Sequence, residues 1–78
     1  MTPAEIEKLI AAGLQGCRVN VRSDDNTHFE ALVVSAEFAG KRPLQRHQMV
    51  YRTLGDAMGG VIHALSIQAL TPDEYAAG

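Results

Sequence analysis

Hydrophobic residues near the amino terminus recur with the period of a helix. They occupy positions i, i+3, i+4 and i+8, namely Ile6, Leu9, Ile10 and Leu14, and this spacing places them on one helical face. The helix is predicted to run from Pro3 to Ala12, because Thr2 can cap it and Glu5 occupies the matching position of a capping box. Gly13 is its predicted stop.

The next two segments alternate between apolar and polar residues, which is the period of a strand. From Cys17 to Arg22, one side is predicted to carry Cys17, Val19 and Val21. Residues 23–27 are all turn formers, and the strand pattern resumes from His28 to Ser35, so we predict a hairpin. The second strand is apolar on both faces at residues 32–34, which predicts a central position in the sheet.

Helical spacing returns between Lys41 and Met58. The predicted buried stripe consists of Val50, Leu54, Ala57 and Met58. Pro43 is predicted to separate a short first turn from the main helix, which would give a pair resembling a helix-turn-helix. The pair Gly59-Gly60 is predicted to end the main helix.

A last strand is predicted from Val61 to Leu70, with one face formed by His63, Leu65, Ile67 and Ala69. The sequence Thr71-Pro72-Asp73-Glu74 forms a second capping box and predicts a brief final helix. The predicted order is therefore α-β-β-α-α-β-α, an α+β plan with helices packed on one face of a three-stranded mixed sheet. Residues 1–78 are predicted to form one domain.

Composition and charge narrow the class of protein. Apolar residues make up 46% and charged residues 21% of the chain, which is typical of a globular domain and not of a disordered or membrane-spanning one. Residues 1–12 do not have the pattern of a secretory signal, so we expect a cytoplasmic protein. The net charge of −2 disfavours nucleic-acid binding by overall electrostatics, and such binding would need a local basic patch.

Few residues are candidates for chemistry. The single cysteine, Cys17, excludes an internal disulfide, and one thiolate cannot supply an ordinary iron-sulfur cluster alone. On its strand it is interpreted as a small buried hydrophobic residue. His63 occupies an apolar face, where it could be a core histidine or a ligand. The three histidines lack zinc-type spacing, and His47 is interpreted as a packing or hydrogen-bonding residue. No nucleophile and base pair stands out, so an enzyme is not expected.

Five blocks resemble the BolA family in order and spacing: residues 28–35, 38–41, 44–51, 62–67 and 71–72. The short hairpin loop is similar to that of the smaller bacterial members. The resemblance implies a KH-like fold of class II. It also implies a non-enzymatic adaptor that binds a monothiol glutaredoxin and shares a [2Fe-2S] cluster with it. Such a protein would act in iron-sulfur cluster trafficking or assembly, or in iron and stress regulation.

The resemblance also implies a set of ligands. His63 matches the carboxy-terminal histidine of the family and would be the main ligand, whereas His28 is the only histidine near the hairpin loop and would be the second. The cysteine of the glutaredoxin and a glutathione thiol would hold the other side of the cluster in a heterodimer. Histidine on one iron and thiolate on the other have a precedent in Rieske centres. The free protein is expected to be a monomer, with no membrane partner.

A rival hypothesis is that the protein is a transcriptional regulator that binds nucleic acid. No acidic residue lies between Glu37 and Asp56, and this segment carries the cations Lys41, Arg42, Arg46 and Arg52. KH domains clamp the nucleotide backbone with a GXXG loop, which here aligns with Gly40-Lys41-Arg42-Pro43. Proline at the fourth position removes a backbone donor. The same cations could instead dock an acidic surface of a partner protein.

Overall fold

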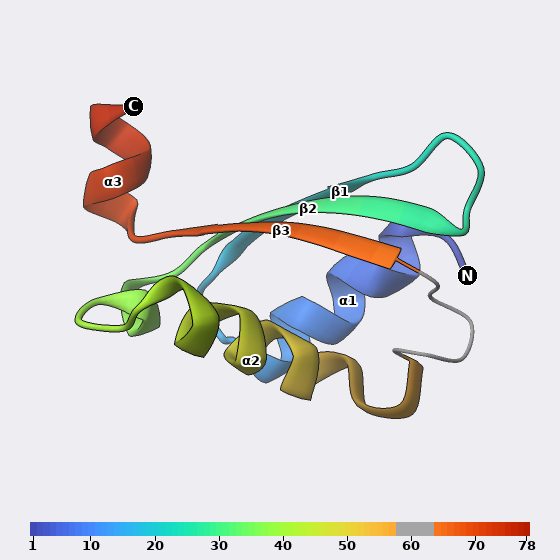
Figure 1. Cartoon of the computed structure of the whole chain (residues 1–78), viewed down its shortest axis with the longest axis horizontal. Helices are drawn as coiled ribbons and strands as arrows, with labels where there is room; N and C mark the ends of the chain where they lie inside the picture. The colour runs from blue at the N-terminus through green and yellow to red at the C-terminus, as the bar shows by residue number, and fades with distance from the viewer. Residues whose placement is uncertain (58–63) are drawn as a thin grey trace.

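A mixed β-sheet with β2 at its centre organises the chain (Figure 1). The computed structural model describes residues 1–57 and 64–78. Its elements are, in order, α1 (Pro3–Gly13), β1 (Arg18–Arg22), β2 (His28–Val34), the 3₁₀ turn η1 (Ala36–Phe38), α2 (Pro43–Leu54), the 3₁₀ turn η2 (Gly55–Ala57), β3 (Ala64–Leu70) and α3 (Pro72–Ala77). β2 pairs antiparallel with β1 and parallel with β3. The α+β class, the hairpin and the central position of the second strand are thereby confirmed.

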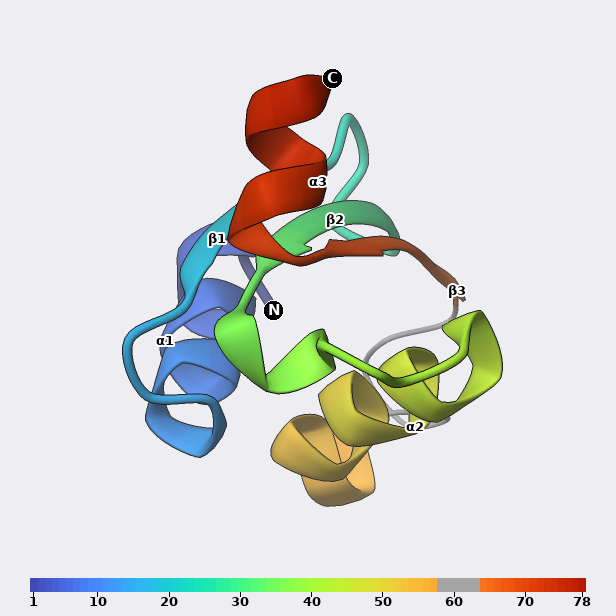
Figure 2. The same ribbon diagram turned by 90° about the vertical axis from the view of Figure 1, so that its left-hand side faces the viewer.

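Helices α1 and α2 lie side by side beneath one face of the sheet (Figures 1 and 2). The core fills the space between these layers and consists of Ile6, Ile10, Leu14, Val21, Phe29, Ala31, Val33, Phe38, Val50 and Leu54. Apart from Phe38, which lies in η1, these positions follow the helical and strand periods of their elements, because each element must bury its apolar side against another. On β3 the predicted face holds for Leu65, Ile67 and Ala69, which are half-buried against this core.

Helix α3 departs from the prediction that all helices pack on one face. It rises from the end of β3 on the side of the sheet opposite α1 and α2 (Figure 1). There the guanidinium of Arg18, on the outer face of β1, lies 5.7 Å from the ring centre of Tyr75. Of the helices that the structure describes, α3 is the one on this outer face, and it has only six residues.

Both predicted capping boxes are confirmed. At the start of α1, the Thr2 hydroxyl accepts the Glu5 N–H and the Glu5 carboxylate accepts the Thr2 N–H. At the start of α3, Thr71 and Glu74 exchange the same two bonds. These bonds satisfy backbone donors that have no partner inside the helix, which is why both helices begin at the predicted prolines.

The predicted cap at the end of α1 and the predicted break at Pro43 were both wrong. Gly13 is the last residue of α1 and does not cap it. A Cβ at Gly13 would lie 2.8 Å from the Cβ of Thr53, so this glycine permits the close approach of α1 to α2. Pro43 is the first residue of a single helix, since proline suits the first turn, and the predicted pair resembling a helix-turn-helix is replaced by η1 and α2.

The end of α2 also differs from the prediction. The helix stops at Leu54, and its C-cap Gly55 has φ of 55°, a conformation that glycine adopts without steric cost. Ala57 packs half-buried against the core. Met58, Gly59 and Gly60 lie outside the described residues.

Candidate functional site

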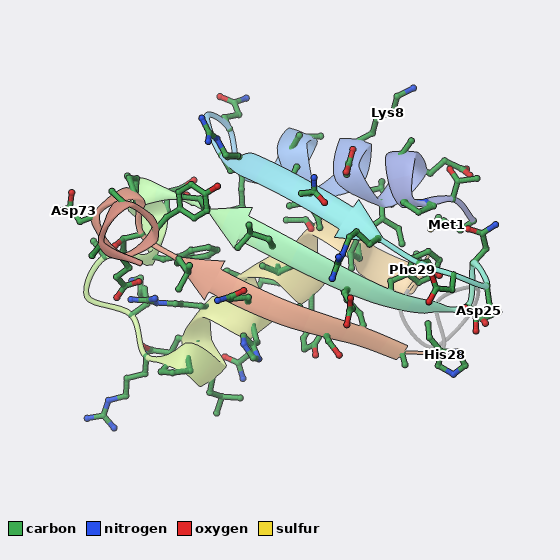
Figure 3. All side chains as sticks on the ribbon, turned by 90° about the horizontal axis from the view of Figure 1, so that it is seen from above. Met1, Lys8, Asp25, His28, Phe29 and Asp73 are labelled. Carbon is green, nitrogen blue, oxygen red and sulfur yellow. The ribbon has the colours of Figure 1, made fainter. Side chains whose placement is uncertain are left out.

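His28 begins β2 and is held by the turn that precedes it. The Oδ1 atom of Asp25 accepts the backbone N–H groups of Thr27 at 3.0 Å and of His28 at 2.9 Å. The Oδ2 atom of the same carboxylate lies 2.8 Å from Nδ1 of the His28 ring. Asp25 therefore fixes both the backbone and the ring of His28 at the tip of the hairpin (Figure 3).

The electrostatics of this pair favour one arrangement of the imidazole. The backbone N–H of His28, then its ring and the N–H of Thr27, hold the pKa of Asp25 well below its usual range. A carboxylate beside Nδ1 favours the proton on that nitrogen, and the neutral ring then keeps the lone pair on Nε2. The His28 side chain is 70% exposed. Its Nε2 is therefore accessible to a group supplied by another molecule.

An open hollow adjoins His28 on the outer face of the sheet. Its lining includes Asp25, His28 and Ala64, together with Arg22 and Glu30. The last two form an ion pair across β1 and β2 at 2.8 Å. Polar and charged groups thus lie beside the exposed imidazole, and the sheet fixes the backbone from which it extends.

The main predicted ligand, His63, lies outside the described residues. It directly precedes Ala64, and Ala64 is the residue of β3 that pairs with His28. The sheet register therefore brings the described end of β3 to His28. Within residues 1–57 and 64–78, no group of three or more His, Cys, Asp or Glu side chains is placed to hold a metal ion.

The cations of the basic segment from Lys41 to Arg52 do not share one surface. Arg46 turns inward, with its side chain 12% exposed, and forms an ion pair with Glu74. Lys41 and Arg42 are exposed at the start of α2. Arg52 lies at the other end of the helix, beside a hollow between α1 and α2. The exposed positive charge is thus divided between the two ends of α2.

The tetrapeptide Gly40-Lys41-Arg42-Pro43 has little backbone capacity left for a phosphate. The N–H of Lys41 donates to the Phe38 carbonyl at 3.0 Å, and that of Arg42 donates to the Gln45 side chain at 2.9 Å. Pro43 has no N–H. The loop therefore lacks most of the free donors with which a glycine-rich loop binds a phosphate.

The remaining candidates have structural surroundings. Cys17 is half-buried beside the core, and burial raises the pKa of its thiol. His47 is half-buried on α2. Sequence reasoning did not single out Asp25 or Glu74 as partners of site residues. A signal for Asp25 was its position three residues before His28 in a turn, where aspartate commonly accepts backbone N–H groups.

Known proteins share this fold and much of this sequence. A family model described as BolA-like protein matches residues 12–74. The human BolA-like protein 1 is 51% identical over 49 residues, which is 63% of this chain and 36% of the human one. The DNA-binding transcriptional regulator BolA of Vibrio cholerae is 45% identical over 56 residues, covering 72% of this chain and 53% of that one. This chain thus spans between about a third and a half of the length of these curated relatives.

A solved structure agrees over almost the whole length. The structure of a BolA protein homologue from Coxiella burnetii superposes with a TM-score of 0.88 at 43% identity, covering 97% of each chain. Among the helices that the structure describes here, none is long and apolar enough to cross a bilayer. The family model, the sequence relatives and the shared fold agree, and the chain belongs to the BolA family.

Proposed function

We propose that this protein is a non-enzymatic adaptor that binds a monothiol glutaredoxin and shares a bridging [2Fe-2S] cluster with it. Its role would be the trafficking or assembly of iron-sulfur clusters, or regulation in response to iron and stress. His63 is the main ligand in this proposal and His28 the second. The cysteine of the glutaredoxin and a glutathione thiol complete the set.

The geometry of His28 carries the proposal. A cluster shared between two proteins needs ligands at the surface, and the His28 side chain is 70% exposed. The carboxylate of Asp25 lies 2.8 Å from Nδ1, which leaves Nε2 as the nitrogen for an external metal. Histidine ligands of metals commonly donate their other N–H to a carboxylate, because this contact orients the ring and raises its basicity.

The donor set fits a shared cluster. Two histidine nitrogens would hold one iron from this chain, and thiolates from the partner would hold the other, as in the mixed ligation of Rieske centres, where histidine raises the reduction potential. Ala64, the residue that follows His63 in the sequence, pairs with His28 in the sheet. Lys41 and Arg42, which are exposed together at the start of α2, would face acidic groups of the partner.

Reconstitution of the cluster tests the ligands. Wild-type protein is mixed with a monothiol glutaredoxin, glutathione, iron and sulfide, and the visible absorption and circular dichroism of the complex are recorded. His63→Ala should abolish or change the spectrum of the mixed complex, and His28→Ala should shift it. His47→Ala is the matched control, because His47 lies on α2 and should leave the spectrum unchanged. A wild-type spectrum for His63→Ala would exclude that ligand.

A second candidate function is binding of nucleic acid. The observation in its favour is that the relative from Vibrio cholerae is described as a DNA-binding transcriptional regulator. Lys41 and Arg42 would then contact phosphates, and binding would weaken steeply with salt. The test is titration of a labelled DNA duplex at low salt with wild type, Arg42→Ala and the control Arg22→Ala. Undetectable binding by the wild type, or equal binding by Arg42→Ala, would count against this function.

A further inference from the structure

The strand β3 forms an edge of the sheet, and its hydrogen bonds to β2 establish which backbone groups face outward. The Ala64 N–H donates to the Thr27 carbonyl, and the Leu70 carbonyl accepts the Ser35 N–H. Successive residues of a strand direct their backbone N–H and C=O groups to opposite sides. The backbone groups of the odd-numbered residues Leu65, Ile67 and Ala69 therefore point away from β2. Figure 1 shows this edge toward the viewer, with none of the described helices in front of it.

The two edges of the sheet are protected to different extents. On β1, the Val21 N–H donates to the Glu7 carboxylate of α1 at 2.8 Å. On β3, the Ala69 carbonyl accepts Nη1 of Arg46 at 3.0 Å. Across the described part of the chain, no other hydrogen bond reaches the outward groups of Leu65, Ile67 or Ala69. Natural proteins commonly block such edges, whereas within residues 1–57 and 64–78 the outward groups of β3 other than the Ala69 carbonyl have no hydrogen-bond partner.

An apolar flank of α2 lies beside this edge. Leu44 and Tyr51, two large hydrophobic residues, are 69% and 38% exposed, and their spacing of seven places them on one side of the helix. Thr53 lies on the opposite side, facing Gly13 of α1. Leu44 and Tyr51 therefore face away from α1, on the side where α2 lies beneath β3 (Figure 2).

Positive charge marks one end of the edge. The Lys41 carbonyl accepts Nε of Arg46 at 2.9 Å, and Nη1 of the same guanidinium binds Ala69. This shared contact places the backbone of Lys41, followed by Arg42, at the Leu70 end of β3. Both side chains are exposed, and no ion pair is recorded for either among the described residues.

From these features we infer that the edge of β3 from Leu65 to Ala69 docks an extended segment of a partner protein as a fourth strand. The segment pairs with the outward backbone groups. Its alternate apolar side chains lie against Leu44 and Tyr51, and an acidic residue at one end lies beside Lys41 and Arg42.

The chemistry of this surface favours a peptide over single-stranded nucleic acid. A nucleic-acid groove combines cations along the strand with aromatic rings on which bases stack. Here Lys41 and Arg42 lie together at one end of the edge, and their backbone N–H groups are already bonded. A row of unbonded backbone groups at strand spacing matches a β-strand directly. Docking of a peptide at this edge requires no iron-sulfur cluster.

The test uses cluster-free protein and synthetic peptides of alternating valine and threonine, with two glutamates at the amino end or at the carboxyl end. Amide hydrogen exchange is followed by NMR. At saturation, we expect exchange at Leu65, Ile67 and Ala69 to slow by at least roughly tenfold with one of the two peptides. Ser66 and Gln68 direct their N–H groups to β2 and are internal controls.

Matched variants separate strand addition from other binding. A peptide N-methylated along its pairing edge keeps its side chains and charge but should lose the protection. The double variant Lys41→Glu with Arg42→Glu and the single variant Leu44→Ser should each weaken binding, by on the order of tenfold for the charge reversal. Arg52→Glu, at the other end of α2, should bind as wild type does.

Several results would overturn the inference. The first is that millimolar peptide does not protect the β3 amides from exchange, and the second is that the N-methylated peptide protects them equally. The third is that oligothymidine perturbs Leu65 and Ile67 but the peptide does not. A concentration-dependent dimer in sedimentation, protected at the same amides, would identify a second copy of this chain as the occupant. Because no cluster or glutaredoxin is present, each result is independent of cluster binding.

Discussion

Arg46 on α2 and Glu74 on α3 form a two-point ion pair, with Nη1 2.6 Å from Oε1 and Nη2 3.3 Å from Oε2. The same guanidinium donates to the carbonyls of Lys41 and Ala69 and lies 5.9 Å from the ring centre of Phe38. Helix α3 has no buried residue of its own. Arg46 therefore joins α2, the end of β3 and α3, which defines its role as structural.

Removal of Arg46 should destabilise the fold. Arg46→Ala removes the guanidinium that donates to the Ala69 carbonyl, and loss of hydrogen bonds to a charged group costs about 2–3 kcal/mol. For a domain of this size, this corresponds to a fall in Tm of roughly 10 °C or more. Thermal unfolding followed by circular dichroism measures the change. Arg52→Ala, an exposed arginine on the same helix, should unfold close to wild type, and an equal loss in both variants would contradict the assignment.

The same pair predicts a pH dependence of stability. Hydrogen bonding to Arg46, then to the Thr71 backbone, lowers the pKa of Glu74 from 4.5 to about 2. Because the folded pKa lies below the ordinary value, the carboxylate stabilises the fold above about pH 4.5, and this contribution is lost as the pH falls toward about 2. Glu74→Gln should therefore show a shallower fall of Tm than wild type over this range. Asp73→Asn, its neighbour on α3, should follow the wild-type slope.

Gly13 should resist replacement although it lies in a helix. Alanine is the better helix former by about 1 kcal/mol, but its Cβ would overlap the side chain of Thr53. We expect Gly13→Ala to lower the free energy of unfolding by about 1–3 kcal/mol through overpacking. Urea unfolding of the single variant and of the exchange Gly13→Ala with Thr53→Gly tests this. The exchange should recover the loss caused by the contact, and no recovery would refute the steric cause.

The edge of β1 should depend on Glu7. Its carboxylate accepts the Val21 N–H at 2.8 Å from another element, and loss of such a bond costs about 1 kcal/mol. In Glu7→Ala, the Val21 amide should exchange faster with solvent than in wild type. Glu7→Gln keeps a side-chain oxygen as acceptor and should preserve most of the protection. Unchanged exchange in Glu7→Ala would mean that the contact does not protect this edge.

The ring of His28 should carry its proton on Nδ1 when neutral. Asp25 lies 2.8 Å from that nitrogen, and the hydrogen bond to one ring nitrogen selects the tautomer. Long-range ¹H–¹⁵N NMR spectra above the pH at which the ring is protonated report the two nitrogens directly. Asp25→Ala should shift the population toward Nε2–H, while Asp24→Ala, in the same turn, should not. A wild-type ring protonated on Nε2 would contradict the arrangement.

Helix ends differed in how far they could be predicted from the sequence. Thr2 with Glu5 and Thr71 with Glu74 were predictable as caps because their partners lie three residues away. Gly13 was misinterpreted because the reason for a glycine there is Thr53, forty positions along the chain. Pro43 fitted both a break and a helix start, and only the completed helix distinguishes them.

The sequence by itself determined the periods of the elements, their caps and the central position of β2, because these follow from local spacing and from residues close along the chain. It also identified His28 and the basic segment as candidates. Tertiary structure decided which cations are free, since the inward turn of Arg46 depends on Ala69 and Glu74 in elements far along the chain. It also decided that β3 lies at an edge of the sheet, which no local pattern reveals, because edges exist only once strands have paired.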